Sequence, residues 1–191
     1  EYGMQSFPSM SMVELFTHEK DRSIDSDVMN AHQKASLGTG NLMKYIEDYY
    51  RVNDDFESIV GLSQIMQAEA IRFAVEAHRR NMPYCMGTLY WQFNDCWPVI
   101  SWSSIDYGGN WKALHYAARK FFSPLLVSIR DLDDKIEIHV VNDQHHEVES
   151  GIRLGLFNMN GDVIFNDLSE INVGPFSSSI YRVFDKNDLL S

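Results

Sequence analysis

The spacing of apolar residues changes near Ser123 and Pro124, and this change divides the chain into two structural units. Before that point, apolar residues recur every three to four positions, as in helices that bury one face. After it, apolar and polar residues alternate, as in strands with one buried face. The sequence therefore predicts one unit over residues 1–122 and a second over residues 123–191.

The first unit is expected to be largely helical. Apolar periodicity predicts helices near residues 9–16, 40–50 and 111–122, with a loop between the first two. The clearest helix runs to Arg80, where cations suit the negative helix terminus and Pro83 forbids continuation.

This long helix is expected to begin with a capping box, in which Asp54 caps the helix and Glu57 reaches back. Its buried face is predicted from the apolar residues at helical spacing. Those residues are Phe56, Ile59, Val60, Met66, Ala70, Phe73, Ala74 and Ala77.

Residues 85–93 (CMGTLYWQF) are predicted to form a buried strand directly after the long helix. A helix that leads into a buried strand is typical of a parallel α/β fold. Such a strand needs parallel neighbours, and the rest of the first unit offers at most a second strand at its very start. Either the chain is a fragment or the strand prediction is wrong, and the long helix before the strand favours a fragment. The sequence therefore predicts a multidomain fragment whose first unit is one part of a larger α/β domain.

The second unit is predicted to be an antiparallel β-sandwich. Several short alternating segments are separated by turn signals such as Asn160-Gly161, a pattern typical of two packed sheets. The expected strands cover residues 125–130, 135–141, 148–158, 163–166 and 178–184.

Charge and cysteine content exclude several partners. A formal charge of −11 without a long basic stripe disfavours nucleic acid. No apolar run approaches the ~20 residues of a membrane span, so no membrane partner is expected.

Cys85 and Cys96 lack metal-site spacing and are expected to be free and buried. The three histidines at 139, 145 and 146 lack the companions of a zinc site, so no metal is expected.

Two long segments resemble a known family. EYGMQSFPS at residues 1–9 and GTLYWQFNDCWPVISWSSIDYGGNWKALHY at residues 87–116 are similar to the signature stretches of β-mannosidases in glycoside hydrolase family 2. The resemblance implies that residues 1–122 are the C-terminal portion of a (β/α)8 TIM barrel. It also implies that residues 123–191 begin an immunoglobulin-like sandwich.

The resemblance implies roles for five residues. Glu1 matches the catalytic nucleophile, and Trp91 matches the tryptophan beneath the mannose ring. Asn94, Asp95 and Trp97 follow in a loop where contacts with sugar are expected. The family's acid/base residue lies in an Asn-Glu pair, which this chain lacks, and the chemistry needs no cofactor.

Neighbouring residues are given more modest roles. Gln5, Ser6 and Phe7 are expected to shape the wall of the pocket, whereas Trp111 and His115 are expected to pack within the fold. Asp95 has a structural alternative, which is to cap the loop that contains it.

The implied parent enzyme hydrolyses terminal non-reducing β-D-mannose residues from manno-oligosaccharides with retention of configuration. The chain alone is expected to be inactive and to self-associate through its truncated barrel edge. Two alternatives remain open: a carbohydrate-binding or structural module without catalysis, and a family 2 β-galactosidase or β-glucuronidase. The sequence leaves a periplasmic, cytoplasmic or lysosomal location open.

Overall fold

The computed structural model describes residues 1–53 and 55–190, which divide into two compact units. The first unit comprises Glu1–Ala77 and Gly87–Phe122. The second comprises His78–Met86 and the chain from Ser123 onward. Separate clusters of buried apolar side chains lie within each unit, so each has a core of its own.

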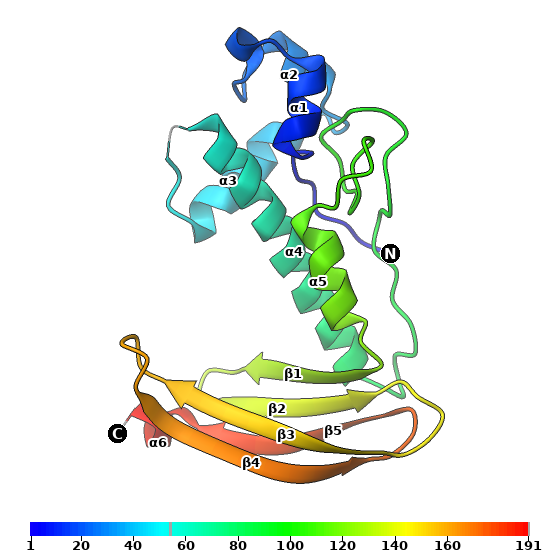
Figure 1. The fold of residues 1–191 in the computed structure, drawn as a ribbon, viewed down its shortest axis with the longest axis vertical. Helices are drawn as coiled ribbons and strands as arrows, with labels where there is room; N and C mark the ends of the chain where they lie inside the picture. The colour runs from blue at the N-terminus through cyan, green and yellow to red at the C-terminus, as the bar shows by residue number, and fades with distance from the viewer. Residues whose placement is uncertain (54, 191) are drawn as a thin grey trace. The chain divides into compact units, whose positions relative to one another are not determined.

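Helices dominate the first unit (Figure 1). The predicted helices near residues 9–16, 40–50 and 111–122 are confirmed. In place of the expected loop after the first of them, a 3-10 turn and a short helix form, the latter because Ser26 Oγ accepts a bond from Met29 N. The elements are α1 (Met10–Phe16), η1 (Glu19–Asp21), α2 (Asp27–Ala31), α3 (Gly38–Tyr49), α4 (Phe56–Arg80) and α5 (Ala113–Phe121). None of the helices in the described ranges is both long and apolar enough to cross a lipid bilayer.

The long helix α4 begins with a side-chain cap at Asp55. Its carboxylate Oδ2 accepts bonds from Ser58 N at 2.9 Å and Ser58 Oγ at 2.6 Å. Asp54, half of the predicted capping box, lies outside the described residues. An acidic cap at this end also suits the positive end of the helix dipole.

One face of α4 is buried, but it is not purely apolar. Ile59, Val60, Met66, Ile71 and Val75 are buried together with two polar residues, Ser63 and Gln67, which are 0% exposed.

The predicted inclusion of Phe73 in this face is wrong, because Phe73 is 72% exposed. Residues two positions apart on a helix point to different faces, and Phe73 is two residues from both Ile71 and Val75. Beyond residue 67, the buried face of α4 packs against α5 in a cluster that includes Leu114 and Phe121.

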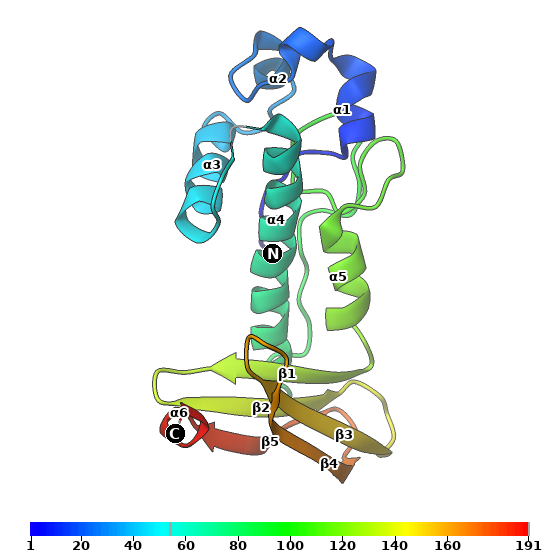
Figure 2. The same cartoon turned by 60° about the vertical axis from the view of Figure 1, so that its left-hand side comes forward.

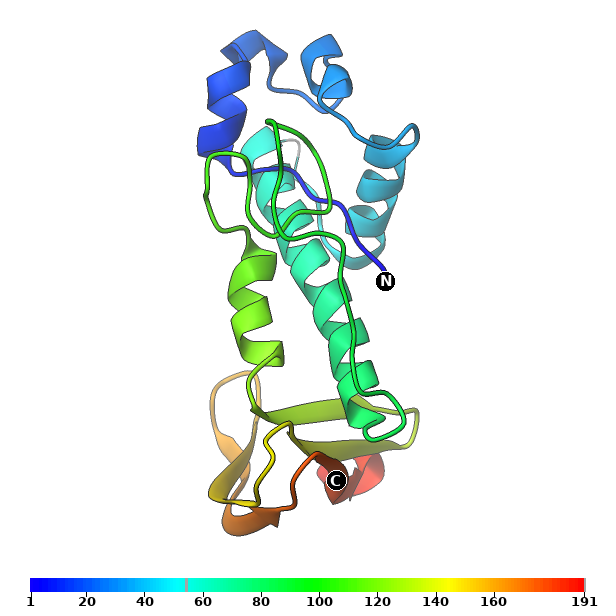
Figure 3. The same cartoon turned by 90° about the vertical axis from the view of Figure 1, so that its right-hand side faces the viewer.

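The predicted buried strand at residues 85–93 is wrong as a regular strand. Tyr90 makes one isolated parallel bridge to Tyr2, and Figure 3 shows the segment as an extended trace. Leu89 is 75% exposed and Phe93 61% exposed. The segment is extended, but among the described residues it has none of the further parallel neighbours from which a buried ladder is built. Exposure also corrects the expectation for the free thiols, since Cys96 is exposed and Cys85 only partly buried.

The second unit consists of two antiparallel sheets followed by a short helix (Figures 1 and 2). All five predicted strands are present, and the fourth extends seven residues beyond its expected end at 166. One sheet has the order β1 (Leu125–Asp131), β2 (Lys135–Asn142), β5 (Ser177–Asp185), and the other pairs β3 (Val148–Phe157) with β4 (Val163–Val173). The helix α6 spans Lys186–Leu190.

The core of this sandwich lies between its two sheets. Ile138 and Val140 of β2 cluster with Ile152 of β3 and with Ile171 and Val173 of β4. These residues occur at alternate positions along their strands, so each strand turns one side toward the facing sheet. The alternation of the sequence thus marks the residues that face the core, although β2 is also buried on its other side, as at Val141.

Asn142, at the end of β2, makes several buried hydrogen bonds within this unit. Its fully buried amide nitrogen donates to the carbonyl oxygens of His146 at 2.9 Å, Val173 at 3.1 Å and Gly174 at 3.0 Å. Its Oδ1 accepts from Gln144 N at 2.9 Å. One side chain thus joins β2 to the turn that follows it and to the end of β4.

We expect Asn142→Leu to lower the free energy of unfolding of the second unit by about 2–4 kcal/mol, because it leaves several backbone groups without their partner. Hydrogen exchange of β2 amides measures the effect. Asn172→Leu on the exposed side of β4 is the matched control, with a change within ~0.5 kcal/mol. Equal losses in the two variants would contradict this account of Asn142.

Candidate functional site

The two motif segments lie side by side in the first unit. Trp91 N donates to Tyr2 O at 2.8 Å, which fixes the parallel bridge between Tyr2 and Tyr90. Further along, Ser6 N donates to Ser101 O at 2.9 Å and Ser101 N donates to Ser6 O at 3.3 Å. Residues almost one hundred positions apart in sequence are therefore paired through their backbones at two points.

The side chains of the paired segments point to two opposite sides. The rings of Tyr2 and Tyr90 pack against the cluster formed by α4 and α5, and the Tyr2 hydroxyl lies 2.8 Å from Thr88 Oγ1. Alternate residues of an extended chain point to opposite sides. By this alternation Glu1 and Trp91 are expected on the side away from the helices, and both are exposed.

Gly3 allows the two segments to approach closely. A Cβ atom at this position would lie 2.5 Å from the backbone oxygen of Trp91 and 2.8 Å from Trp102 Cδ1. Neither distance is compatible with van der Waals contact, and a backbone atom cannot move away without breaking the pairing. The glycine of the Glu-Tyr-Gly sequence is therefore needed for the contact between the Glu1 and Trp91 segments.

Two polar residues of α4 hold these segments, and the sequence analysis missed both: Gln67 bonds both segments and Ser63 bonds the first. Gln67 Nε2 donates to Met4 O at 2.8 Å and to Ser103 O at 3.2 Å, while its Oε1 accepts from Ser6 Oγ at 2.8 Å. Ser63 Oγ accepts from Phe7 N at 3.0 Å. The available signal was two polar residues four positions apart within the buried stripe of an amphipathic helix.

Asp95 is held inside the loop that follows Trp91. Its carboxylate accepts bonds from Gln92 Nε2 at 3.1 Å, Ser101 Oγ at 2.7 Å and Ser103 Oγ at 2.5 Å. The side chain is only 8% exposed. This geometry matches the structural alternative for Asp95, which is to organise its own loop.

Asp106 plays a similar part at the other end of this loop. It accepts bonds from Ser9 N at 3.2 Å and Ser9 Oγ at 2.5 Å, and from Asn110 N at 2.9 Å. It is 2% exposed. Through Ser9, which also caps α1, Asp106 fastens the first motif segment to the second.

A buried lysine completes the polar interior of the site. Lys112 is 0% exposed, and its Nζ has no hydrogen-bond partner in the described part of the chain. Burial lowers the pKa of Lys112 to about 7, against the opposing attraction of Asp95 and Asp106. The sequence analysis assigned no role to this residue, although a lysine between tryptophan and a helix gives little signal by itself.

The remaining predicted site residues lie along the same loop. Asn94 is exposed, and its backbone oxygen accepts from Gln92 Nε2 at 3.1 Å. The Trp97 ring stacks on His32 at a centroid distance of 5.0 Å, and Lys34 Nζ lies 5.6 Å from the same ring. The structure thus pairs the backbone segments that carry Glu1 and Trp91, and engages Asp95 and Trp97 in contacts within the chain.

The expected pocket wall is only partly present. Gln5 lines a hollow of about 240 Å³ together with Gly3 and Trp102. Phe7, by contrast, is 0% exposed and belongs to the hydrophobic core, so the prediction that it faces the pocket is wrong. Trp111 and His115 pack edge to face at 4.3 Å, in agreement with the packing role expected of them.

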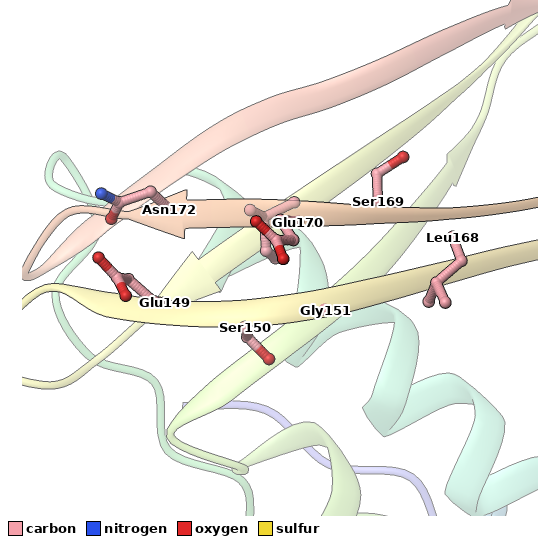
Figure 4. Close-up of a pocket in the computed structure, with 8 residues that line it drawn as sticks. Glu149, Ser150, Gly151, Leu168, Ser169, Glu170 and Asn172 are labelled. Carbon is pink, nitrogen blue, oxygen red and sulfur yellow. The ribbon is translucent and has the colours of Figure 1, made fainter.

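A larger hollow of about 760 Å³ lies on the β3–β4 ribbon of the second unit (Figure 4). Glu149 and Glu170 line it, but both are exposed and lie on the side of the ribbon that faces away from the sandwich core. None of the motif residues contributes to it. No group of three or more potential metal ligands occurs among the residues that the structure describes.

Comparison with known proteins agrees with the motifs. Residues 134–191 match the family model described as Mannosidase Ig/CBM-like domain. A β-mannosidase from Capra hircus is 37% identical over 156 residues, which cover 75% of this chain and 18% of the goat protein. A β-mannosidase from Bos taurus is 39% identical over 147 residues, which cover 70% of this chain and 17% of the bovine protein.

Solved structures show the same fold. The β-D-mannosidase from Dictyoglomus thermophilum superposes with a TM-score of 0.87 at 31% identity, covering 96% of this chain and 23% of that protein. The exo-chitosanase CsxA from Amycolatopsis orientalis gives a TM-score of 0.79 at 17% identity, covering 96% of this chain and 25% of that protein, which shows similarity of fold alone.

The helical unit with its paired motif segments and the following sandwich match one part of the fold of a glycoside hydrolase, the part that ends in a mannosidase immunoglobulin-like domain. Within that class, the chain belongs to the β-mannosidases of glycoside hydrolase family 2. It spans less than a quarter of the length of the relatives that it matches.

We expect Gly3→Ala to lower the free energy of unfolding of the first unit by roughly 1–3 kcal/mol, because the added methyl group overlaps a backbone atom. All four tryptophans lie in this unit, so denaturant unfolding followed by tryptophan fluorescence measures the change. Gly87→Ala is the control, since a Cβ there meets no heavy atom within 4 Å. Similar stability of the two variants would show that Gly3 is not required for the close approach.

Proposed function

We propose that this chain is part of a retaining β-mannosidase that removes terminal non-reducing β-D-mannose residues from manno-oligosaccharides. The pairing of the Glu1 and Trp91 segments carries the proposal. It brings together the backbones of two segments that carry an exposed carboxylate, Glu1, and an exposed indole, Trp91. The names of the β-mannosidase relatives support the choice of sugar.

In this proposal, residues 1–122 are the C-terminal portion of the (β/α)8 catalytic barrel and residues 123–191 begin the immunoglobulin-like domain. The Tyr2–Tyr90 bridge would belong to the last two barrel strands, with α4 and α5 on the outer side. Exposed apolar side chains such as Leu89 and Phe93 support this view, because strands of a barrel are covered on both faces. The rest of the barrel would come from other parts of the parent protein.

Glu1 is the proposed nucleophile. A retaining glycosidase needs one ionised carboxylate to attack the anomeric carbon and a protonated carboxyl group about 5 Å away to assist the leaving group. Water then hydrolyses the glycosyl-enzyme with the second group acting as base. This chain contains no Asn-Glu pair, so we assign the acid/base to the remainder of the parent protein.

Trp91 is the proposed platform for the mannose ring, with half of its surface exposed beside the Glu1 segment. An indole face stacks on the C–H groups of a sugar and so favours one ring orientation. Asn94 is an exposed polar residue three positions after Trp91 in the loop, and we assign it to sugar contact. Asp95 and Trp97 would act by shaping this loop, given their contacts within the chain.

In the complete parent protein, we expect Glu1→Gln to lower kcat on an aryl β-mannoside by at least about 10⁴-fold, since the amide cannot attack as a nucleophile. Stopped assays with purified protein measure the loss. Tyr107→Phe, at an exposed position of the second motif, is the control and should retain activity. Full turnover by Glu1→Gln would refute the assignment of Glu1.

The chain on its own should give no turnover of the same substrate, because it lacks both a proton donor and a closed pocket. Its exposed apolar positions should also promote self-association, and light scattering tests this at increasing concentration. Measurable β-mannoside hydrolysis that Glu1→Ala abolishes, or a strictly monomeric chain at high concentration, would contradict these expectations. Binding of mannobiose without hydrolysis, lost in Trp91→Ala, would instead favour a carbohydrate-binding module.

A further inference from the structure

We propose that a hollow beside the paired motif segments binds the second sugar residue of the substrate, the residue that leaves when the terminal mannose is cleaved off. This inference rests on the function proposed above and assigns the part of the chain that holds the leaving sugar. The hollow has a volume of about 240 Å³ and lies entirely within the first unit. Its lining comes from the first motif segment, from α3 with the turn before it, and from Trp102 of the second motif segment.

The hollow adjoins the contact between the two motif segments. Gly3 is one of its lining residues, and a Cβ atom there would lie 2.5 Å from the backbone oxygen of Trp91 and 2.8 Å from Trp102 Cδ1. The hollow is therefore next to the segment that carries the proposed platform for the terminal mannose. An enzyme that removes terminal non-reducing residues holds one sugar on that side of the cleaved bond, so a neighbouring sugar site holds the leaving part of the substrate.

The lining of the hollow has the chemistry of a site for a neutral sugar. Trp102 and Tyr45 provide aromatic rings, and Gln5 and Asn41 provide amide groups. Aromatic rings stack on the C–H groups of a sugar, while amides both donate to and accept from its hydroxyl groups. None of the described residues that line the hollow is charged, so a phosphate or a uronate would find no ionic partner among them. A volume below the ~300–1,000 Å³ of drug-sized sites suits a single sugar residue.

The amide of Gln5 is held in place but not fully paired. Its Nε2 donates to Gln33 Oε1 at 2.9 Å and to Ile100 O at 3.4 Å. Gln5 is only 8% exposed, yet its Oε1 has no hydrogen-bond partner within the described chain and is not closed off from solvent. An unpaired acceptor on a fixed amide is suited to accept a hydrogen bond from a sugar hydroxyl group.

Gln33, the partner of Gln5, is fixed in turn by the start of α3. Its Oε1 also accepts from Ala35 N at 3.0 Å, and its Nε2 donates to Thr39 Oγ1 at 3.2 Å. A Cβ atom at Gly38 would overlap the Gln33 side chain, so only glycine leaves room for this amide. The polar side of the hollow is therefore set by hydrogen bonds and by a close approach that the chain makes without any ligand.

Asn41 and Tyr45 provide the side of the hollow that belongs to α3. They are four positions apart and therefore lie on the same face of the helix. Both side chains are exposed, and that of Asn41 makes no hydrogen bond within the described chain. Either side chain can therefore be truncated without creating a cavity in the core.

Kinetics of the complete parent protein on two substrates test the proposal. β-Linked mannobiose has a second sugar for the hollow, whereas the methyl group of methyl β-D-mannoside is too small to fill it. We expect Asn41→Ala and Tyr45→Ala each to lower kcat/KM for mannobiose about tenfold, mainly through KM, and to change kcat/KM for the methyl glycoside less than about twofold. The matched control is Tyr49→Ala, one turn further along α3 and not part of the lining, which should change neither value more than about twofold.

Equal losses on the two substrates would overturn the proposal, since the variants would then act on the terminal mannose or on the fold. Variants that behave like Tyr49→Ala on mannobiose, while the methyl glycoside is still hydrolysed, would also overturn it and would leave the function proposed above intact. A parent protein that hydrolyses neither mannoside would contradict that function and this inference together.

Discussion

The buried amide of Gln67 is the contact on which the arrangement of the motif segments depends. It bonds Met4, Ser6 and Ser103 at once, so a single side chain of α4 fixes both segments against one helix. Buried polar groups are costly unless satisfied, and Gln67 has partners for both its nitrogen and its oxygen. The parallel bridge between Tyr2 and Tyr90 needs this support, because no further ladder bonds extend it into a sheet in the described chain.

Gly3 and two buried carboxylates further stabilise the motif segments that Gln67 bonds. Gly3 removes the side chain that would separate the Glu1 and Trp91 segments, and the carboxylates of Asp95 and Asp106 organise the loop between them and α5. Gln67, Asp95 and Asp106 are buried, whereas Glu1 and Trp91 are exposed. A rigid support of this kind is what a catalytic carboxylate needs if its distance from a sugar ring is to be maintained.

Much of the fold could be predicted from the sequence, because helices and strands that bury one face have apolar residues at regular spacing. Alternation located all five strands of the sandwich, and helical spacing located the longer helices. Predictions failed where structure depends on contacts with distant residues. Residues 85–93 have the composition of a buried strand, but Tyr90 makes only one isolated bridge among the described residues. Phe73 is apolar, yet its side chain is exposed. The site residues Glu1 and Trp91 came from family resemblance. Gln67 left only a weak signal, a polar residue in the buried stripe of a helix, and its partners Met4, Ser6 and Ser103 are far from it in sequence.

The central claim is that the Glu1 carboxylate attacks a mannose ring held over Trp91. Treatment of the complete parent protein with a 2-fluoro mannoside that bears a good leaving group, followed by peptide mass mapping, tests it most directly. The account predicts that the trapped glycosyl group is attached to Glu1, since a retaining enzyme passes through a covalent intermediate. A label on another carboxylate, or an active enzyme that forms no covalent adduct, would contradict it.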